Sequence, residues 1–578
     1  MKNANLRLII LLIVFVLAAN TAIVAQKPVH LLNNSIENCR KCNKIFPEKI
    51  VENKIDSVSK QYIYCLRNKG FITASVDSVI NKNDTFFVNV YQGSLYKWED
   101  ITFNDDKAGL MYGLGISTKK LSGKPIIYEN IIRAKNKLLS NYENNGYPFV
   151  SIKTDSFEVS PGFISINYSV QSRELVSFDS LEITGNAKIS NSYLEHYLGI
   201  LSHKFYSEKK VMLINKRLKE LTFLTTDKPS EVYFIDNKAR VRLFLKEKKA
   251  NQFNGILGII PDAKTPGKLL LTGDISLNLI NSFHRGEQII FSWKKLETAS
   301  QNLFASVQLP YILNKPVGAL ASIKLFKKDS SFLNVTTHIE VPFYFTGANT
   351  IGIYYENFSS ALLPASSLSQ VNILPAISDF TSNIIGISIF YSSLDYKFNP
   401  RKGLIVKFQA GYGKKTIEKN PEINPSVYNG VEMNSFRNEF TADISQFTNI
   451  TGKWVLKLRG QTGYINTKIL LKNELYRIGG LSTLRGFDEE SIYASVYGTA
   501  TSEIRFLFEE NSALFAFYDQ GYYKNIDIKN DNPAGFGAGI EFQTKAGIFT
   551  LSYALGHQLG NSVQFRTARV HFGFVNRF

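Results

Sequence analysis

The second half of the chain, residues 251–578, alternates between apolar and polar side chains in short segments and shows no helical period. In residues 535–542, for example, Phe536 and Ile540 fall on one side, whereas glycines and Glu541 fall on the other. Strict alternation predicts β-strands with one apolar face. About 16 such segments can be placed, with roughly 20 residues for each strand and its connection. We therefore expect an all-β, 16-stranded antiparallel sheet.

The connections between these segments alternate in length, which indicates a transmembrane β-barrel. Short connections are expected near 312–317, 347–349, 509–511 and 544–547, and long ones near 359–381, 414–432 and 466–497. Outer-membrane barrels have short periplasmic turns and longer outer loops, and their strands face lipid on one side and the lumen on the other. A soluble β-sandwich is the alternative, which the even strand count and the export signal described below disfavour.

The first half of the chain, residues 27–250, has a helical period and repeats itself roughly every 75 residues. The clearest copy is 95–173, in which Ile131, Leu138 and Tyr142 follow the spacing of an amphipathic helix. Gly146 then ends this helix, as glycine commonly does. The expected strands of this copy lie near 149–157 and 163–170.

The other two copies, 27–94 and 174–250, follow the same order of strand, helices, strand and strand. In the first copy we expect a helix from Ile50-Val51 through Tyr62-Ile63 to Lys69, and strands near 74–80 and 85–91, while its opening strand is obscure. In the third we expect a strand at 176–186, helices near 192–201 and 208–223, and strands near 232–235 and 240–246. The first half is therefore predicted to consist of three α+β modules.

These modules resemble the polypeptide-transport-associated (POTRA) domain, whose pattern includes a glycine and an aromatic residue after the second helix. The pair is Gly70-Phe71 in the first copy and Gly146-Tyr147 in the second, whereas the third has Leu221-Thr222-Phe223 instead. The resemblance implies exposed sheet edges that accept an extended chain through backbone hydrogen bonds. A rigid spacer is the alternative role.

The N-terminus predicts export through a signal peptide, residues 1–26. Lys2 and Arg7 precede an apolar run at 8–19, and small residues at 22–26 offer a cleavage site. An uncleaved membrane anchor is the alternative, but the run is shorter than the ~20 residues that a spanning helix needs. The formal net charge of +18 is then read as attraction to anionic lipid headgroups or as solubility of loops, and not as nucleic-acid binding.

The three cysteines, Cys39, Cys42 and Cys65, all lie near the N-terminus. In an oxidising envelope Cys39 and Cys42 could form a small disulfide, with Cys65 left free or serving as an alternative partner. A redox-active site would require the pair at the start of a helix in a βαβ unit, and the segment has no such pattern. We expect structural or incidental cysteines and no metal site.

A motif in the longest barrel connection points to a family. This connection, between the eleventh and twelfth predicted strands, contains Leu484-Arg485-Gly486-Phe487. The sequence resembles the Arg-Gly-Phe/Tyr motif in the inward-folded sixth loop of the BamA/TamA superfamily of outer-membrane assembly and translocation proteins, which usually has valine where this chain has Leu484. In that family the loop arginine pairs with acids on the following strands. The resemblance implies that Arg485 pairs with Glu503 and Asp519 in the lumen, where a bidentate guanidinium would hold the loop.

Two further features support the resemblance. Asp395 and the run from Asn399 to Gly403 resemble the Asn-Pro-x-x-Gly turn that enters a middle strand of the family's barrel, and its role is expected to be structural. In the family the first and last barrel strands pair poorly, so a client strand can add between them. Here these strands lie near 253–260 and 564–577, and glycines weaken the packing of the first. The implied lateral seam comprises Phe253, Gly255, Gly258, Phe572, Phe574 and the terminal Phe578.

The sequence shows no catalytic arrangement: its seven histidines have no metal-ligand spacing, and it lacks a nucleophile elbow and a phosphate loop. We expect no enzyme and no cofactor. The resemblance implies a protein in the outer membrane of a diderm bacterium, with its N-terminal modules in the periplasm. It would insert β-barrel proteins or assist insertion, and three modules place it nearer the TamA-like branch. Implied partners are unfolded outer-membrane clients, outer-membrane lipids, and lipoprotein assembly subunits or a TamB-like protein. A two-partner-secretion translocator and an accessory structural barrel remain the alternatives.

Overall fold

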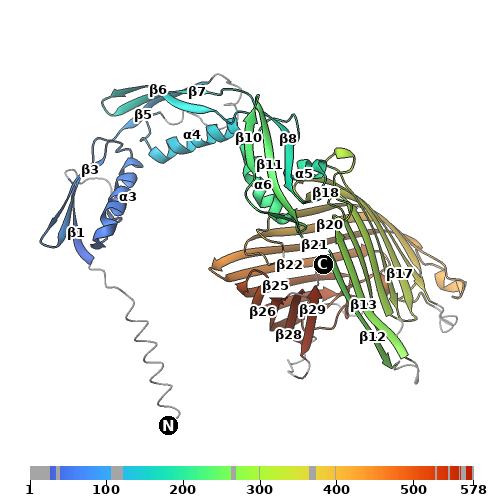
Figure 1. Ribbon diagram of the computed structural model, residues 1–578. Coiled ribbons are helices and arrows are strands. Elements are labelled where there is room, and N and C mark those ends of the chain that lie inside the picture. Colours follow the sequence, from blue (N-terminus) through green and yellow to red (C-terminus); the bar gives the residue numbers. More distant parts are fainter. Residues whose placement is uncertain are drawn as a thin grey trace, which may run out of the picture. The chain divides into compact units, whose positions relative to one another are not determined.

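The computed structural model describes residues 26–33, 40–105, 122–261, 269–297, 300–363, 373–397, 399–526, 530–544, 547–558, 560, 566 and 568–575. The predicted signal peptide, apart from its last residue, lies outside them. The main element is a 16-stranded antiparallel sheet that curls into a barrel, and each strand is a neighbour of the next one along the chain (Figure 1). The predicted fold class, α+β repeats followed by an all-β barrel, is confirmed.

The strands of this sheet are hairpin-connected neighbours with one long excursion. In order they are β12 (Gln252–Pro261), β13 (Leu269–Ile280), β14 (Gln288–Glu297), β15 (Ser300–Leu309), β16 (Ala319–Lys328), β17 (Phe332–Thr346), β18 (Asn349–Leu362), β19 (Phe380–Ser392), β20 (Gly403–Ile417), β21 (Asn434–Thr451), β22 (Trp454–Thr467), β25 (Val496–Glu509), β26 (Ser512–Lys524), β27 (Ala534–Gln543), β28 (Ile548–His557) and β29 (Arg569–Val575). The excursion between β22 and β25 separates the eleventh strand from the twelfth, as predicted.

The alternation of side chains along the strands explains why they form a barrel. On β25, Thr501, Glu503 and Arg505 are buried inside, whereas Ala500 and Ile504 are exposed on the outer surface. Because a strand turns successive side chains to opposite faces, one face of every strand is available to lipid and the other to the lumen. The predicted separation of the two faces is confirmed.

Three small mixed sheets precede the barrel (Figure 1). The first contains β1 (Gln26–Asn33), β2 (Lys49–Val51), β3 (Ser75–Lys82) and β4 (Thr85–Tyr91), with helices α2 (Arg40–Asn43) and α3 (Ile55–Arg67). The second contains β5 (Lys97–Asp105), β6 (Ser151–Ser160) and β7 (Phe163–Gln171), with helix α4 (Tyr128–Glu143). The third contains β8 (Ser177–Gly185), β9 (Leu224–Thr226), β10 (Glu231–Ile235) and β11 (Lys238–Glu247), with helices α5 (Asn191–Leu198) and α6 (Glu208–Glu220).

The structure corrects the prediction for the first of these modules. Ile50 and Val51 do not begin a helix; they form β2, which pairs with β1, and α3 starts at Ile55. Pairing with a neighbouring strand suits two β-branched residues better than a helical turn does. The obscure opening is β1, which also runs parallel to β4. Strands β5 and β9 were not predicted either, because they are short or lack strict alternation.

The two Gly-aromatic pairs occupy equivalent positions after a helix. Gly70 and Gly146 have φ angles of +99° and +98°, a region that side chains with a Cβ rarely adopt. Each glycine carbonyl accepts a hydrogen bond from the residue just before the strand that opens the next module, from the amide of Tyr96 in one case and of Val176 in the other. A Cβ on either glycine would also lie under 3 Å from a leucine side chain. The motif therefore allows close contact between consecutive segments. The boundaries at 94, 173 and 250 stay a prediction.

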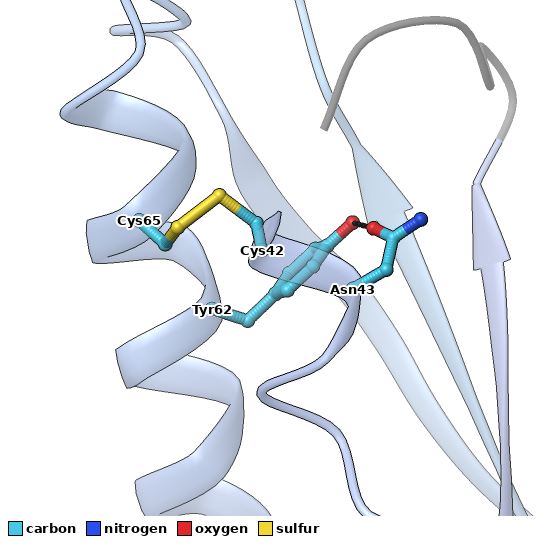
Figure 2. The surroundings of a disulfide bond; sticks show 4 residues. All are labelled: Cys42, Asn43, Tyr62 and Cys65. Atoms are coloured by element: carbon cyan, nitrogen blue, oxygen red, sulfur yellow. Dashed lines mark hydrogen bonds between the residues drawn. A yellow bond between two sulfur atoms is a disulfide. The ribbon is translucent and has the colours of Figure 1, made fainter. Parts of the chain in front are cut away.

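The structure decides between the cysteine pairings that the sequence left open, in favour of Cys65 as a partner. Cys42 of α2 and Cys65 of α3 form a disulfide, so Cys65 is the partner of Cys42 and is not free (Figure 2). Cys39 lies outside the described residues. The Tyr62 hydroxyl donates to Asn43 Oδ1 beside the disulfide at 3.0 Å, and Tyr62 is fully buried in the module's core. The tertiary fold brings α2 against α3, which sequence spacing could not show.

Removing this disulfide is expected to lower the stability of the first module by about 3 kcal/mol, because the crosslink closes a loop of 23 residues in the unfolded chain. The variant is Cys42→Ala with Cys65→Ala in the full chain. Pulse proteolysis in urea, followed at the N-terminal segment, measures the change. Cys39→Ser is the matched control and should leave the cleavage midpoint unaltered. An unchanged midpoint in the double variant would contradict a stabilising role.

Candidate functional site

The excursion between β22 and β25 is the candidate functional element, and we call residues 468–495 the inner loop. Its stem is a short hairpin of β23 (Tyr476–Ile478) and β24 (Ile492–Ala494). Its tip carries the motif from Leu484 to Phe487. The inner loop contacts the barrel wall along strands β16–β22 and β25–β29.

Arg485 is bound to two carboxylates of the wall. Its Nε and one terminal nitrogen donate to the two oxygens of Asp519 at 2.8 and 2.7 Å, and the other terminal nitrogen donates to Glu503 at 2.6 Å. The Asp519 carboxylate also accepts from the Arg485 backbone amide, and the guanidinium lies 3.5 Å from the ring centroid of Phe517. Both acids are buried. Bidentate pairing in a buried site fixes the direction of the side chain as well as its charge.

The backbone beside Arg485 lies so close to the wall that only glycines fit there. A Cβ on Gly535 of β27 would lie 1.9 Å from the Arg485 carbonyl oxygen. A Cβ on Gly556 of β28 would lie 2.4 Å from the Gly486 carbonyl oxygen. Leu484 is fully buried in an apolar cluster that also contains Phe487. The motif is therefore held by shape and apolar packing in addition to charge.

Two residues of the last strand also bind the tip of the loop. The Gly486 amide donates to Nε2 of His571 at 3.3 Å, so this nitrogen carries no proton. Arg569 donates to the Asp488 carboxylate at 2.7 and 3.1 Å, in a pair that is half exposed. Residues 485–488 thus contact all five strands from β25 to β29. Because Arg569 and His571 alternate with the outward-facing Phe572, the sequence indicates that they face the lumen, but it does not predict these contacts.

The start of the inner loop has a second anchor that sequence reasoning missed. The Glu474 carboxylate binds Lys415 of β20 and accepts from Arg437 of β21 at 2.6 Å, and Lys415 and Glu474 are completely buried. Arg437 also pairs with Glu439 at 2.9 Å. Next to it, Asn473 donates to the Ser360 hydroxyl at 2.6 Å. The alternation of side chains along the strand could have indicated that Arg437 and Glu439 face the lumen. Nothing in the local sequence indicates their partner in the loop.

The predicted Asn-Pro-x-x-Gly turn connects to the same network. The Asp395 carboxylate accepts from the amides of Arg401 and Lys402, which closes the turn. Asn399 is buried, and its side-chain oxygen accepts from Arg505 at 2.9 Å. Arg505 in turn donates to Glu503, the acid that holds Arg485. The turn therefore supports the site, which is more than the purely structural role expected for it.

A cavity of about 390 Å³ remains between the inner loop and the wall of β16–β21. Charged and polar side chains line it, among them Lys324, Glu356, Glu439, Arg437, Arg477 and Tyr476. Among the described residues no group of histidine, cysteine and acidic side chains could hold a metal ion. No helix in the described part of the chain is long and apolar enough to cross a membrane.

The predicted seam lies between the two ends of the sheet. Some Cα atoms of β12 and β29 come within 8 Å of each other, yet within the described ranges no hydrogen-bonded ladder joins these strands. Phe253 and Phe572 are exposed on them, and Gly255 also lies on β12. Gly258 and Phe574 belong to the two strands by their backbone, whereas Phe578 lies outside the described residues.

The comparisons with known proteins agree with this architecture. Among solved structures, CdiB from Acinetobacter baumannii matches with a TM-score of 0.53 at 13% identity, covering 84% of this chain and 90% of that one. CdiB from Escherichia coli matches with a TM-score of 0.51 at 13% identity, covering 91% and 97%. BamA from Haemophilus ducreyi lacking POTRA domains 1–3 matches with a TM-score of 0.43 at 14% identity, covering 84% and 100%. At these identities the two CdiB matches show a likeness of the fold alone, and nothing is inferred from the BamA match.

The sequence comparisons identify the family. No curated protein matches the chain in a sequence search. Residues 281–578, just over half of the chain, match the Omp85 superfamily domain. The chain therefore belongs to the Omp85 superfamily, whose barrels lie in the outer membrane and insert or translocate polypeptides.

Proposed function

We propose that this protein inserts β-barrel proteins into the outer membrane, or assists their insertion, by adding client strands at the seam between β12 and β29. The observation that carries the proposal is that each of these two strands has one edge without a hydrogen-bonded neighbour among the described residues. They lie side by side without a ladder among the described residues. An unpaired strand edge is a template for another strand.

The inner loop supports a gating role in this proposal. Arg485 and Gly486 attach the tip of the loop to β26 and to His571 of β29, while Glu474 attaches its start to β20 and β21. The loop thus connects the last strand with a distant part of the wall. For β29 to separate from the barrel, the contacts of His571 and Arg569 must break, or the loop must move with the strand.

Client capture is assigned to the exposed edge of the second module. Strand β6 lies at the end of its sheet and is ten residues long, and most of its side chains are exposed. Phe157 and Val159 are 66% and 55% exposed on it. Apolar side chains beside unpaired backbone groups suit an extended, unfolded outer-membrane client. Lipoprotein subunits or a TamB-like protein are further partners in this scheme. The three modules before the barrel accord with placing the protein in a TamA-like branch of the superfamily.

A two-partner-secretion translocator is the second candidate. Such proteins usually carry an N-terminal plug helix and two POTRA domains. Here residues 26–33 form β1, in the sheet of the first module, and residues 40–43 form α2, crosslinked to α3. Three mixed sheets precede the barrel. Both observations favour insertion over translocation. The protein would act without an enzymatic step and without a cofactor.

Locking the seam is expected to abolish insertion. Cysteines at Phe253 or Gly255 of β12, combined with one at Phe572 of β29, are placed in a Cys39→Ser background that keeps the Cys42–Cys65 disulfide. After oxidation, outer-membrane protein levels should fall as in a depletion strain, because β29 can no longer part from β12. Reduction should restore them.

The matched control places cysteines at Phe253 and Leu277, which are cross-strand neighbours on β12 and β13. This bond restrains β12 to its regular neighbour and leaves the seam free, so function should persist. If the seam lock leaves barrel assembly intact, the insertion proposal is wrong. Loss of export of a single dedicated partner, with normal barrel assembly, would support the translocator instead.

A further inference from the structure

Two apolar side chains project from neighbouring short turns at the end of the barrel that adjoins the third module. Phe283, in the turn between β13 and β14, is 69% exposed, and Leu313, in the turn between β15 and β16, is 88% exposed. Among the large hydrophobic side chains in the described part of the chain, none is more exposed than Leu313. Short turns of outer-membrane barrels lie on the periplasmic side.

Hydrogen bonds with buried residues hold the backbone of both turns. The buried Glu287 carboxylate accepts hydrogen bonds from the amides of Phe283 and Arg285, at 2.5 and 3.0 Å. In the other turn, Tyr311 is buried and its hydroxyl donates to the Gly347 carbonyl at 2.8 Å. Leu313 has a φ of +54°, a left-handed conformation that costs an L-residue roughly 1–2 kcal/mol. In water, neither packing nor backbone preference would favour a leucine there.

The third module fixes the position of both turns. The third module's helices α5 and α6 and the barrel belong to one compact unit. The Ser190 amide, before α5, donates to the His284 carbonyl at 2.8 Å, and the Ser192 hydroxyl donates to Asn314 at 2.7 Å. The rings of Tyr193 on α5 and Tyr311 lie 5.6 Å apart between centroids. These contacts occupy the side of each turn that faces α5 and leave Phe283 and Leu313 uncovered.

The two turns adjoin the lipid-facing surface of the barrel. On the adjoining strands, Phe291, Val307 and Leu309 are exposed on the outer face, and Leu309 is the last residue of β15 before the Leu313 turn. The apolar outer surface therefore reaches the strand ends next to both turns. An apolar patch in this place borders the headgroup region of the inner leaflet.

Three cations lie in or next to these turns: Arg285 and Lys315 belong to them, and the Lys188 carbonyl accepts from Asn281 of the first turn. Lys188, Arg285 and Lys315 are all exposed, and the structure shows no ion-pair partner for them among the residues it describes. Basic side chains near an anionic bilayer surface each strengthen binding by about five-fold. Apolar side chains that enter a bilayer and cations at its surface together form the usual pattern of a membrane-contact site.

We propose that Phe283 and Leu313 insert into the periplasmic leaflet of the outer membrane, and that Lys188, Arg285 and Lys315 bind anionic phospholipid headgroups around them. The five residues are called the rim patch. Because α5 is bonded to both turns, the rim patch sets the depth of the barrel and holds the third module against the membrane surface. This role is independent of what the seam does.

The test uses tryptophan as a depth probe in the full-length protein. Leu313→Trp and Phe283→Trp are reconstituted in nanodiscs that contain lipids brominated on the acyl chains, and the signal of the parent protein is subtracted. Bromine quenches only tryptophans that enter the bilayer. We expect quenching of both probes. Met212→Trp, at an exposed site on α6 of the same module, is the matched control and should be quenched by acrylamide in water but not by the brominated lipid.

The headgroup preference is tested by placing the brominated acyl chains on one class of lipid at a time. At equal lipid fraction, brominated phosphatidylglycerol should quench Leu313→Trp more strongly than brominated phosphatidylcholine. Lys188→Gln with Arg285→Gln and Lys315→Gln should remove this difference. A Leu313→Trp probe that behaves like Met212→Trp overturns the proposal. The proposal is also overturned, in favour of a protein partner, if Leu313→Trp becomes shielded from acrylamide only when a periplasmic protein is added. Equal quenching by both lipids overturns the assignment of the cations.

Discussion

Replacing Arg485 with alanine is expected to release the tip of the inner loop from the wall and to destabilise the barrel by about 3–5 kcal/mol, because Asp519 would remain buried without its cation. Glu503 would keep Arg505 and Lys457 as partners. Trypsin should then cut the loop from outside the membrane, and the barrel should lose its compact form on a gel at a lower temperature. Arg485→Lys keeps the charge but loses the two-pronged pairing, so it should fall between the wild type and alanine.

Arg569→Ala provides the control for this prediction. The Arg569–Asp488 pair also joins the loop tip to the wall, but both side chains are largely exposed. Exposed pairs contribute about 0–1 kcal/mol, so this variant should keep a protected loop and a nearly unchanged melting temperature. A protected loop in Arg485→Ala would show that apolar packing around Leu484 holds the motif without its charge.

Glu474→Ala is expected to have a similarly large effect at the other anchor. The substitution leaves Lys415 and Arg437 buried without the carboxylate that joins them, and breaking such a buried pair costs about 3–5 kcal/mol. The start of the loop, residues 468–475, should become accessible to proteases while the Arg485 contacts persist. Hydrogen exchange of the loop amides, compared with Arg485→Ala, would separate the two anchors.

Glu432→Ala is the matched control for the second anchor. Glu432 pairs with Lys468 at the beginning of the same loop, but this pair is exposed. Its removal should leave protease access unchanged and should lower the free energy of unfolding by no more than about 1 kcal/mol. If Glu474→Ala is equally silent, the buried lysine and arginine have alternative partners, and the second anchor does not hold the loop.

The local pattern of the sequence determined most of the fold. Alternation along segments such as 535–542 reflects the two-residue period of a strand between lipid and lumen, so it shows in the chain without any knowledge of neighbours. The Gly-aromatic pairs at Gly70 and Gly146 likewise mark positions where the backbone itself demands glycine. The Arg485 motif stood out because it occurs in the longest connection of a barrel.

Only the tertiary structure decided which distant groups meet. Cys42 pairs with Cys65 because α2 packs on α3. Glu474 meets Lys415, which is 59 residues away, because the loop folds back across the lumen. Contacts of this kind depend on strand order, on register and on the path of a loop, none of which has a local period. The alternation of side chains along a strand shows which face a charged residue occupies, but it does not show which residue it will contact.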